Sequence, residues 1–185
     1  CTIENAVKYL ADEQVKLGHE VHVVTSNYGV KGKLKYEYIN GVHIQRVKSM
    51  RLLGYPDLIN PLEYPDVLKE ADIVHGHSQN SLFTVKIMKY AKKHGLKTAI
   101  YFMAIDALHD HPNPVVRILG PMYAKRNLLS AIEFSDVKLV KSVRDLEILK
   151  KKYHMDNVHS VPDGVSDSII NAPNMAEEFR GKYGI

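Results

Sequence analysis

The sequence predicts an α/β fold built on a doubly wound, mostly parallel sheet. Two observations lead to this prediction. Short runs rich in valine and isoleucine alternate with longer segments whose apolar residues recur at helical spacing, and this alternation is typical of right-handed βαβ units. The apolar run at 72–77 also leads directly into small polar residues, as expected where a buried parallel strand ends at a binding crevice.

The first part of the chain is predicted to form a helix followed by two strands. Apolar residues recur at helical spacing over 3–17, and Gly18 stands where a left-handed residue ends a helix. Residues 20–26 predict a strand, and the polar residues 28–35 predict a loop. Residues 41–47 alternate in polarity, which indicates a partly exposed or edge strand.

The rest of the chain is predicted to alternate strands and helices. A proline-containing region at 55–65 leads into a short helix that ends near Glu70. The elements expected after it are strand 72–77, helix 81–94, strand 97–103, helical segments between 113 and 133, strand 136–141, helix 142–153 and strand 157–161. Gly120 and Pro121 are expected to break the 113–133 segment in two, because proline removes a backbone donor.

Composition indicates one ordinary globular domain. The chain has 185 residues, of which 45% are hydrophobic and 25% are charged. Residues 1–168 are predicted to form this domain, and 169–185 are predicted to form a linker, since Asn171-Ala-Pro-Asn174 precedes a short helical pattern. The single cysteine, Cys1, excludes an internal disulfide framework.

Charge and hydropathy narrow the classes of partner. The net charge of +4 is interpreted as a solvated lysine-rich face, with anionic lipid or phosphate ligands as the alternative. Nucleic acid is not expected, because the aromatic residues are not interleaved with the basic ones. No run approaches the roughly 18 apolar residues of a membrane-spanning helix, so a cytoplasmic location, with peripheral membrane contact as an extension of it, is predicted.

Two histidines end the strand at 72–77. His75 and His77 alternate along it and can share one face, as ligand pairs do in some metal hydrolases. Further ligands would come from a loop after the next strand, from Asp106, His109 or His111. The alternative is that one histidine is a hydrogen-bonded core residue, while the other binds a polar ligand together with Ser78.

Three later segments also carry candidate chemistry. Asp106 is suited to accept hydroxyl groups of a sugar or to fix a histidine tautomer, whereas the neighbouring Asp110 is equally suited to a turn before Pro112. Ser142 is a good helix N-cap, with exposed amides for an anion as the alternative. Asp163 and Gly164 form a turn in which glycine can take a positive φ.

Taken together, four segments in order resemble the N-terminal half of the retaining GT-B glycosyltransferases of family 4. They are Gly18-His-Glu-Val-His-Val-Val-Thr-Ser26, Ala71-Asp-Ile-Val-His-Gly-His-Ser78, Ser135 to Leu149, and Val161-Pro-Asp-Gly-Val165. The resemblance covers nearly the whole chain. Within the family, 24–29 and 75–81 look closest to the branch of the GPI-anchor N-acetylglucosaminyltransferase.

This resemblance implies a two-domain enzyme of the hexosyltransferase type with its site between two Rossmann-like halves. The N-terminal half would bind a glycan or lipid-linked acceptor, and a C-terminal half would hold most of the nucleotide-sugar donor, so this chain alone is expected to be inactive. No metal or other cofactor is expected, and no catalytic residue is assigned. The alternative functions are a non-catalytic carbohydrate-binding module of the same fold and a metal-dependent hydrolase that uses His75 and His77. The expected substrate-binding residues are His77, Ser78, Asp106, His109, Ser142, Asp163 and Gly164.

The resemblance also brings out departures from the family pattern. The family pattern includes a strand and a Gly-Gly loop before the first helix. It also implies a histidine where this chain has Met103, and an asparagine where this chain has Asp163. Residues 114–130 mix apolar residues with Arg117 and other basic residues, which suits either a membrane-surface helix or a core helix.

Overall fold

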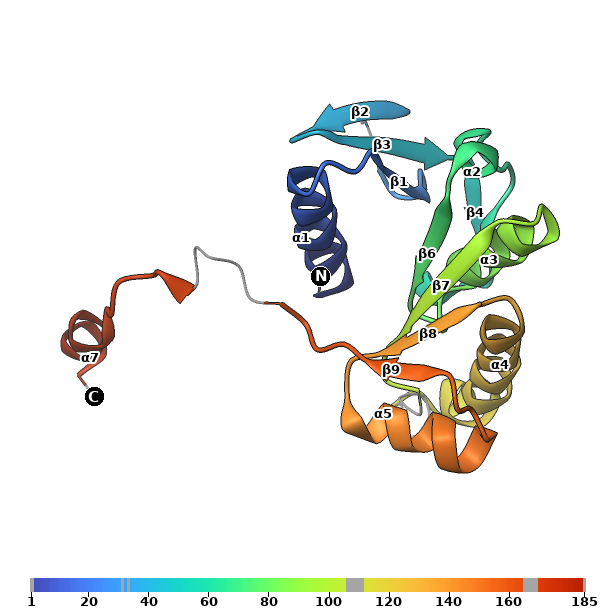
Figure 1. Ribbon diagram of the computed structural model, residues 1–185. Coiled ribbons are helices and arrows are strands. Elements are labelled where there is room, and N and C mark those ends of the chain that lie inside the picture. Colours follow the sequence, from blue (N-terminus) through green and yellow to red (C-terminus); the bar gives the residue numbers. More distant parts are fainter. Residues whose placement is uncertain (1, 31, 33, 106–111, 165–169, 185) are drawn as a thin grey trace.

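The computed structural model describes residues 2–30, 32, 34–105, 112–164 and 170–184 (Figure 1). Their strands form a three-stranded sheet, a two-stranded sheet and a four-stranded parallel sheet. The α/β fold with a parallel sheet is therefore confirmed. Among the described strands, β1 and β6 share no ladder, and the strand that the resemblance implies before the first helix stays a prediction.

The N-terminal part is a helix on a small sheet. Helix α1 (Thr2–Lys16) ends before Gly18, whose φ of 89° confirms the predicted left-handed terminator. Strand β1 (Val21–Ser26) pairs in parallel with β3 (Val42–Val47), and β3 pairs antiparallel with β2 (Tyr36–Ile39). The strand predicted at 41–47 is confirmed and is partly exposed, but it is not an edge strand, because β2, which the sequence analysis did not find, covers that edge.

A two-stranded sheet and a short helix connect the two larger sheets. Strand β4 (Ser49–Arg51) pairs antiparallel with β5 (Ile59–Pro61), around the short 3₁₀ helix η1 (Pro56–Leu58). Strand β5 lies within the proline-containing region 55–65, for which no strand was predicted, and β4 lies before that region. The predicted short helix ending at Glu70 is confirmed as α2 (Val67–Glu70).

The four-stranded sheet confirms the predicted alternation of strands and helices. Its order is β6 (Ile73–His77), β7 (Lys97–Phe102), β8 (Val137–Val140) and β9 (Val158–Ser160), all parallel. The connecting helices are α3 (Leu82–Lys93), α4 (Pro114–Glu133) and α5 (Val143–Glu147), the last continuing into the π-helical turn η2 (Ile148–Lys152).

The main core lies between this sheet and its helices. Met88 of α3, Ile100 and Phe102 of β7, Val140 of β8 and Leu149 are fully buried in it. Each such side chain contributes about 1.5–3 kcal/mol by leaving water. The sheet is consequently a rigid base for residues at its carboxyl edge.

Helix α4 is continuous, so the predicted break at Gly120-Pro121 is wrong. Asn113 caps its start by accepting a hydrogen bond from the amide of Val115 at 2.9 Å. The helix buries Gly120, Ala124 and Leu128 among other residues. Packing of this face outweighs the one backbone hydrogen bond that Pro121 removes.

The last described helix, α7 (Ala176–Tyr183), lies apart from the sheets (Figure 1). It has no buried residue. The helical pattern predicted near the end of the chain is therefore present, without packing against the domain.

Candidate substrate site

The candidate site is the edge of the four-stranded sheet at which its parallel strands end. His77, the last residue of β6, lies in register with Tyr101 of β7, and Tyr101 lies in register with Leu139 of β8. Because parallel strands finish at one edge, the segments after β6, β7, β8 and β9 meet there. The shared edge is the one predicted from the apolar run at 72–77, and a binding crevice along it stays a prediction.

The two histidines at the end of β6 lie against each other. Their ring centroids are 4.4 Å apart and the rings are tilted by 36°. Nε2 of His75 and Nδ1 of His77 are buried, and neither has a hydrogen-bond partner among the described residues. Because these two nitrogens lack a partner only among the described residues, the alternative of a hydrogen-bonded core histidine stays a prediction.

Both imidazoles are held in the neutral form. Burial lowers the pKa of His75. Burial, and secondarily the charge of His75, lowers the pKa of His77 to about 4. A neutral imidazole nitrogen without a partner can accept or donate a hydrogen bond to a ligand hydroxyl, depending on its tautomer.

Ser78 is buried and has an unusual backbone. Its φ of 68° is in the left-handed region, which costs a non-glycine residue about 1–3 kcal/mol. Its amide donates to the carbonyl of Tyr101 at 3.0 Å, which ties the first residue after β6 to β7. Strain of this kind is concentrated at functional sites.

Gln79, which the sequence analysis did not single out, joins the loops after β6 and β7. Its side chain is almost fully buried and forms two hydrogen bonds with the backbone of Met103. Oε1 accepts from the amide at 3.0 Å, and Nε2 donates to the carbonyl at 2.9 Å. The backbone of Met103 is therefore fixed, although this residue brings no polar side chain to the site.

Asp163 is connected to two residues that sequence reasoning missed. Its carboxylate forms an ion pair with Lys141 and accepts a hydrogen bond from the hydroxyl of Tyr101 at 3.1 Å. Burial, and then the bond to Asp163, raises the pKa of Tyr101 to about 12. The carboxylate of Asp163 thus has a cation and a hydroxyl as partners within this same domain. The position of Lys141, directly after β8, was the available clue.

Ser142 serves as the predicted N-cap of α5. Its Oγ accepts a hydrogen bond from the amide of Asp145 at 3.1 Å. The carboxylate of Asp145 accepts from the amide of Ile105 at 3.3 Å, so it holds the chain after β7. Capping is confirmed, and a substrate-binding role for Ser142 stays a prediction.

The remaining predicted site residues add no contact to the candidate site. Asp106, His109 and His111 lie outside the described residues. Gly164 is exposed and its φ is not in the left-handed region. The predicted turn with a positive φ at this glycine is therefore wrong. Within the described part of the chain, His75 and His77 belong to no group of three metal-ligating side chains.

Comparison with known proteins decides the family. The family model described as Glycosyltransferase Family 4 matches residues 3–168. The chain belongs to glycosyltransferase family 4. No curated protein sequence matches significantly.

Solved structures support the fold of this family 4 domain. Sucrose-phosphate synthase from Thermosynechococcus elongatus is similar over 97% of the chain, with a TM-score of 0.65 and 11% identity. A second chain of the same enzyme and organism is similar over 96% of this chain and 93% of its own length, with a TM-score of 0.52 and 14% identity. The family 4 domain spans 46% of the first of these two chains, and its fold is that of the N-terminal half of a GT-B glycosyltransferase.

Proposed function

We propose that this family 4 domain binds the acceptor in an enzyme that transfers a sugar from a nucleotide-sugar donor with retention of configuration. The observation that supports the acceptor role is the pair of buried imidazole nitrogens of His75 and His77 at the carboxyl edge of the sheet, for which the described residues offer no hydrogen-bond partner. Neutral imidazoles suit hydroxyl groups, which both donate and accept hydrogen bonds. Acceptors of this reaction present such hydroxyls.

The described residues at this edge favour positioning over nucleophilic chemistry. In the proposed reaction the acceptor oxygen forms a bond to the anomeric carbon, the nucleoside diphosphate leaves with the electrons of the broken bond, and the acceptor proton passes to the departing phosphate. The fixed loops around Ser78 and Gln79 would orient the acceptor and exclude water. Such positioning contributes several kcal/mol to a barrier.

We propose that the donor is held mainly by a second half of the enzyme, to which residues 169–185 form the linker. The chain spans about half of the sucrose-phosphate synthase chain that it resembles. Helix α7 has no buried residue and lies apart from the sheets (Figure 1), as suits a connecting segment. The domain alone is then expected to bind acceptor without transferring sugar.

The outer face of α4 supports peripheral membrane contact and a lipid-linked acceptor. Val115, Ile118 and Met122 are 62%, 70% and 72% exposed and follow helical spacing, so they share one face. Lys125 and Arg126 are exposed next to them in the chain. Apolar side chains flanked by cations bind the surface of anionic bilayers. No described helix is long and apolar enough to cross a membrane.

The acceptor role is tested by titrating the isotope-labelled chain with short glycans and with polyprenyl phosphates. Saturable changes in the NMR resonances of His77 and Ser78 are expected with one of these classes. A His77→Asn variant should bind at least about tenfold more weakly, and His159→Gln, an exposed position on β9, should bind normally. Unchanged resonances at His77 with both classes would argue against acceptor binding.

The transfer reaction is tested separately, on a protein that contains both halves. Calorimetry with a panel of nucleotide sugars should show binding, and a radiolabelled sugar should move to the acceptor found by NMR. The resemblance of 24–29 and 75–81 to the branch of the GPI-anchor N-acetylglucosaminyltransferase makes N-acetylglucosamine and a lipid-linked acceptor the first pair to test. Failure to bind any nucleotide sugar would count against the enzyme assignment.

A further inference from the structure

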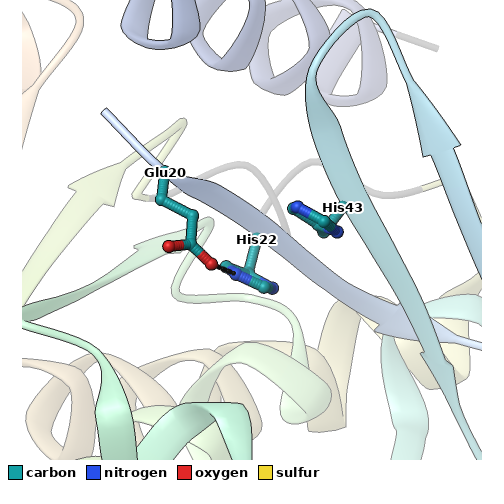
Figure 2. Close-up of side chains that lie close together, drawn as sticks. All are labelled: Glu20, His22 and His43. Atoms are coloured by element: carbon teal, nitrogen blue, oxygen red, sulfur yellow. Dashed lines mark hydrogen bonds and ion pairs between the residues drawn. The ribbon is translucent and has the colours of Figure 1, made fainter. Parts of the chain in front are cut away.

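A second cluster of polar side chains lies on the three-stranded sheet, away from the candidate substrate site. Glu20 directly precedes β1, His22 lies on β1, and His43 lies on β3 in register with His22 (Figure 2). Residues two apart in extended chain share a face, and residues in register on neighbouring strands lie side by side. The backbone alone therefore brings a carboxylate and two imidazoles together.

The side chains of this trio meet. The rings of His22 and His43 stack with centroids 4.6 Å apart and an angle of 12° between their planes. Nε2 of His22 lies 2.7 Å from Oε1 of Glu20. One ligand atom from each of the three residues lies within 4.8 Å of the other two. Within the described residues, these are the only three histidine, cysteine or acidic side chains so placed.

We propose that Glu20, His22 and His43 form a binding site for a divalent transition-metal ion such as Zn²⁺. Two imidazoles and one carboxylate are a common protein ligand set for Zn²⁺, and water can fill the fourth position of an exposed site. Hard cations such as Mg²⁺ prefer oxygen ligands and are not expected here.

The adjustment needed for coordination is small. Zn²⁺ lies about 2.0–2.1 Å from its nitrogen ligands, so two of its ligand atoms are at most about 4 Å apart. The trio exceeds this limit by less than about 1 Å. The parallel rings must also turn so that their nitrogens converge, which the broad torsion about Cβ–Cγ of histidine allows. The Glu20–His22 hydrogen bond is exchanged for bonds to the ion.

The surroundings of the trio favour a preformed site. His22 and His43 are carried by β1 and β3, which are paired over all six residues of β1. Tyr38 of β2 packs against His43 with ring centroids 4.7 Å apart, which limits the orientations of that imidazole. All three ligand residues are exposed, so an ion can reach them without opening the fold. A bound ion would join β1 to β3 through side chains.

The test uses the full 185-residue chain with Cys1→Ser as the background, so that the thiol does not bind the probe. Calorimetry with ZnCl₂ should give one ion per chain, MgCl₂ should give no binding, and saturating Zn²⁺ should raise Tm. His22→Asn and His43→Asn should each weaken Zn²⁺ binding at least about tenfold, because loss of even an outer-shell partner often costs that much. His19→Gln, next to Glu20 in the chain but outside the trio, and the distant His159→Gln should bind Zn²⁺ as the background does.

Two results would overturn the proposal. One is the absence of saturable Zn²⁺ binding, and the other is unchanged affinity in the His22→Asn and His43→Asn variants. NMR of the unmutated imidazoles gives a readout that does not depend on any variant folding: Zn²⁺ should shift the ring resonances of His22 and His43 and leave those of His159 in place. Shifts confined to other histidines would also refute the site.

Discussion

The hydroxyl of Tyr101 lies 3.1 Å from Oδ1 of Asp163 and also donates to the carbonyl of Val161 at 2.7 Å. Tyr101 is on β7, whereas Asp163 follows β9, and β8 lies between these two strands. One side chain thus crosses two strand positions and fixes the segment after β9 at the candidate site. Lys141 holds the same carboxylate from the end of β8.

Tyr101→Phe is expected to release this segment. Loss of a hydrogen bond shared with a carboxylate should lower the free energy of unfolding by about 1–3 kcal/mol. Urea unfolding followed by circular dichroism measures this change. The amide resonances of Asp163 and Gly164 should move, whereas those of α1 should not.

The same variant tests the pH dependence of stability. The pKa of Tyr101 is raised to about 12 from its ordinary value of 10.0, so the folded protein keeps this proton when the unfolded chain has lost it. The stabilisation is complete below about pH 10 and is lost as the pH rises toward 12. Tyr101→Phe should flatten the decline of unfolding free energy in this range. A slope identical to that of the unmutated chain would show that the hydroxyl is not held as described.

His77 is expected to control stability on the acid side of neutrality. Its pKa is lowered to about 4 in the folded protein, so the unfolded chain takes up a proton near pH 6.5 and the folded chain does so only at lower pH. Stability is present above about pH 6.5 and falls between pH 6.5 and 4, by on the order of 1–3 kcal/mol. Unfolding free energies measured over this range should fall less steeply in His77→Asn.

Gly76, between the two site histidines, is expected to tolerate no side chain. A Cβ there would lie 2.9 Å from Sδ of Met88 and 2.9 Å from Cγ2 of Thr84, both on α3. Gly76→Ala should therefore push α3 from β6 and destabilise the domain by about 1–3 kcal/mol. Gly164→Ala is the control, since a Cβ at that position meets nothing within 4 Å. Equal stability of the two variants would contradict this packing.

The sequence predicted strands that are marked by an apolar run of their own, such as β6. It missed strands such as β2, which form only because they pair with another strand. The apolar run before His75 and His77 predicted both β6 and the edge at which it ends. Strand β2 was missed because Tyr36 and Tyr38 are exposed, so its residues carry no buried pattern and its existence depends on pairing with β3.

The candidate site was predicted only where polar residues follow a strand directly. Tyr101 looked like one more residue of an apolar strand, and its hydroxyl partner lies 62 positions away. Lys141 looked like ordinary surface charge. The role of Tyr101 leaves no local pattern, and the one local sign for Lys141 is its place directly after β8, because both contacts to Asp163 arise from the order in which β7, β8 and β9 lie in the sheet.

At the amino ends of β7 and β8, on the edge of the sheet opposite the candidate site, Asp136 forms an ion pair and hydrogen bonds. Its carboxylate forms an ion pair with Lys92 of α3 and accepts hydrogen bonds from the amide and the hydroxyl of Thr98, both at 3.0 Å. Chiefly through the bond to Lys92, and with help from Thr98, its pKa is lowered to about 2. The carboxylate thus links α3, β7 and the start of β8.

Asp136→Asn should remove this link and its response to acid. Because the folded pKa lies below the unfolded value, the stabilisation is present above about pH 4 and is lost as the pH falls toward 2. At neutral pH the variant should be less stable by about 1–2 kcal/mol, a modest value because the carboxylate is partly exposed. The difference from the unmutated chain should shrink as unfolding is measured at successively lower pH. A difference that stays constant down to pH 2 would mean that packing at Asp136, rather than its charge, stabilises this edge.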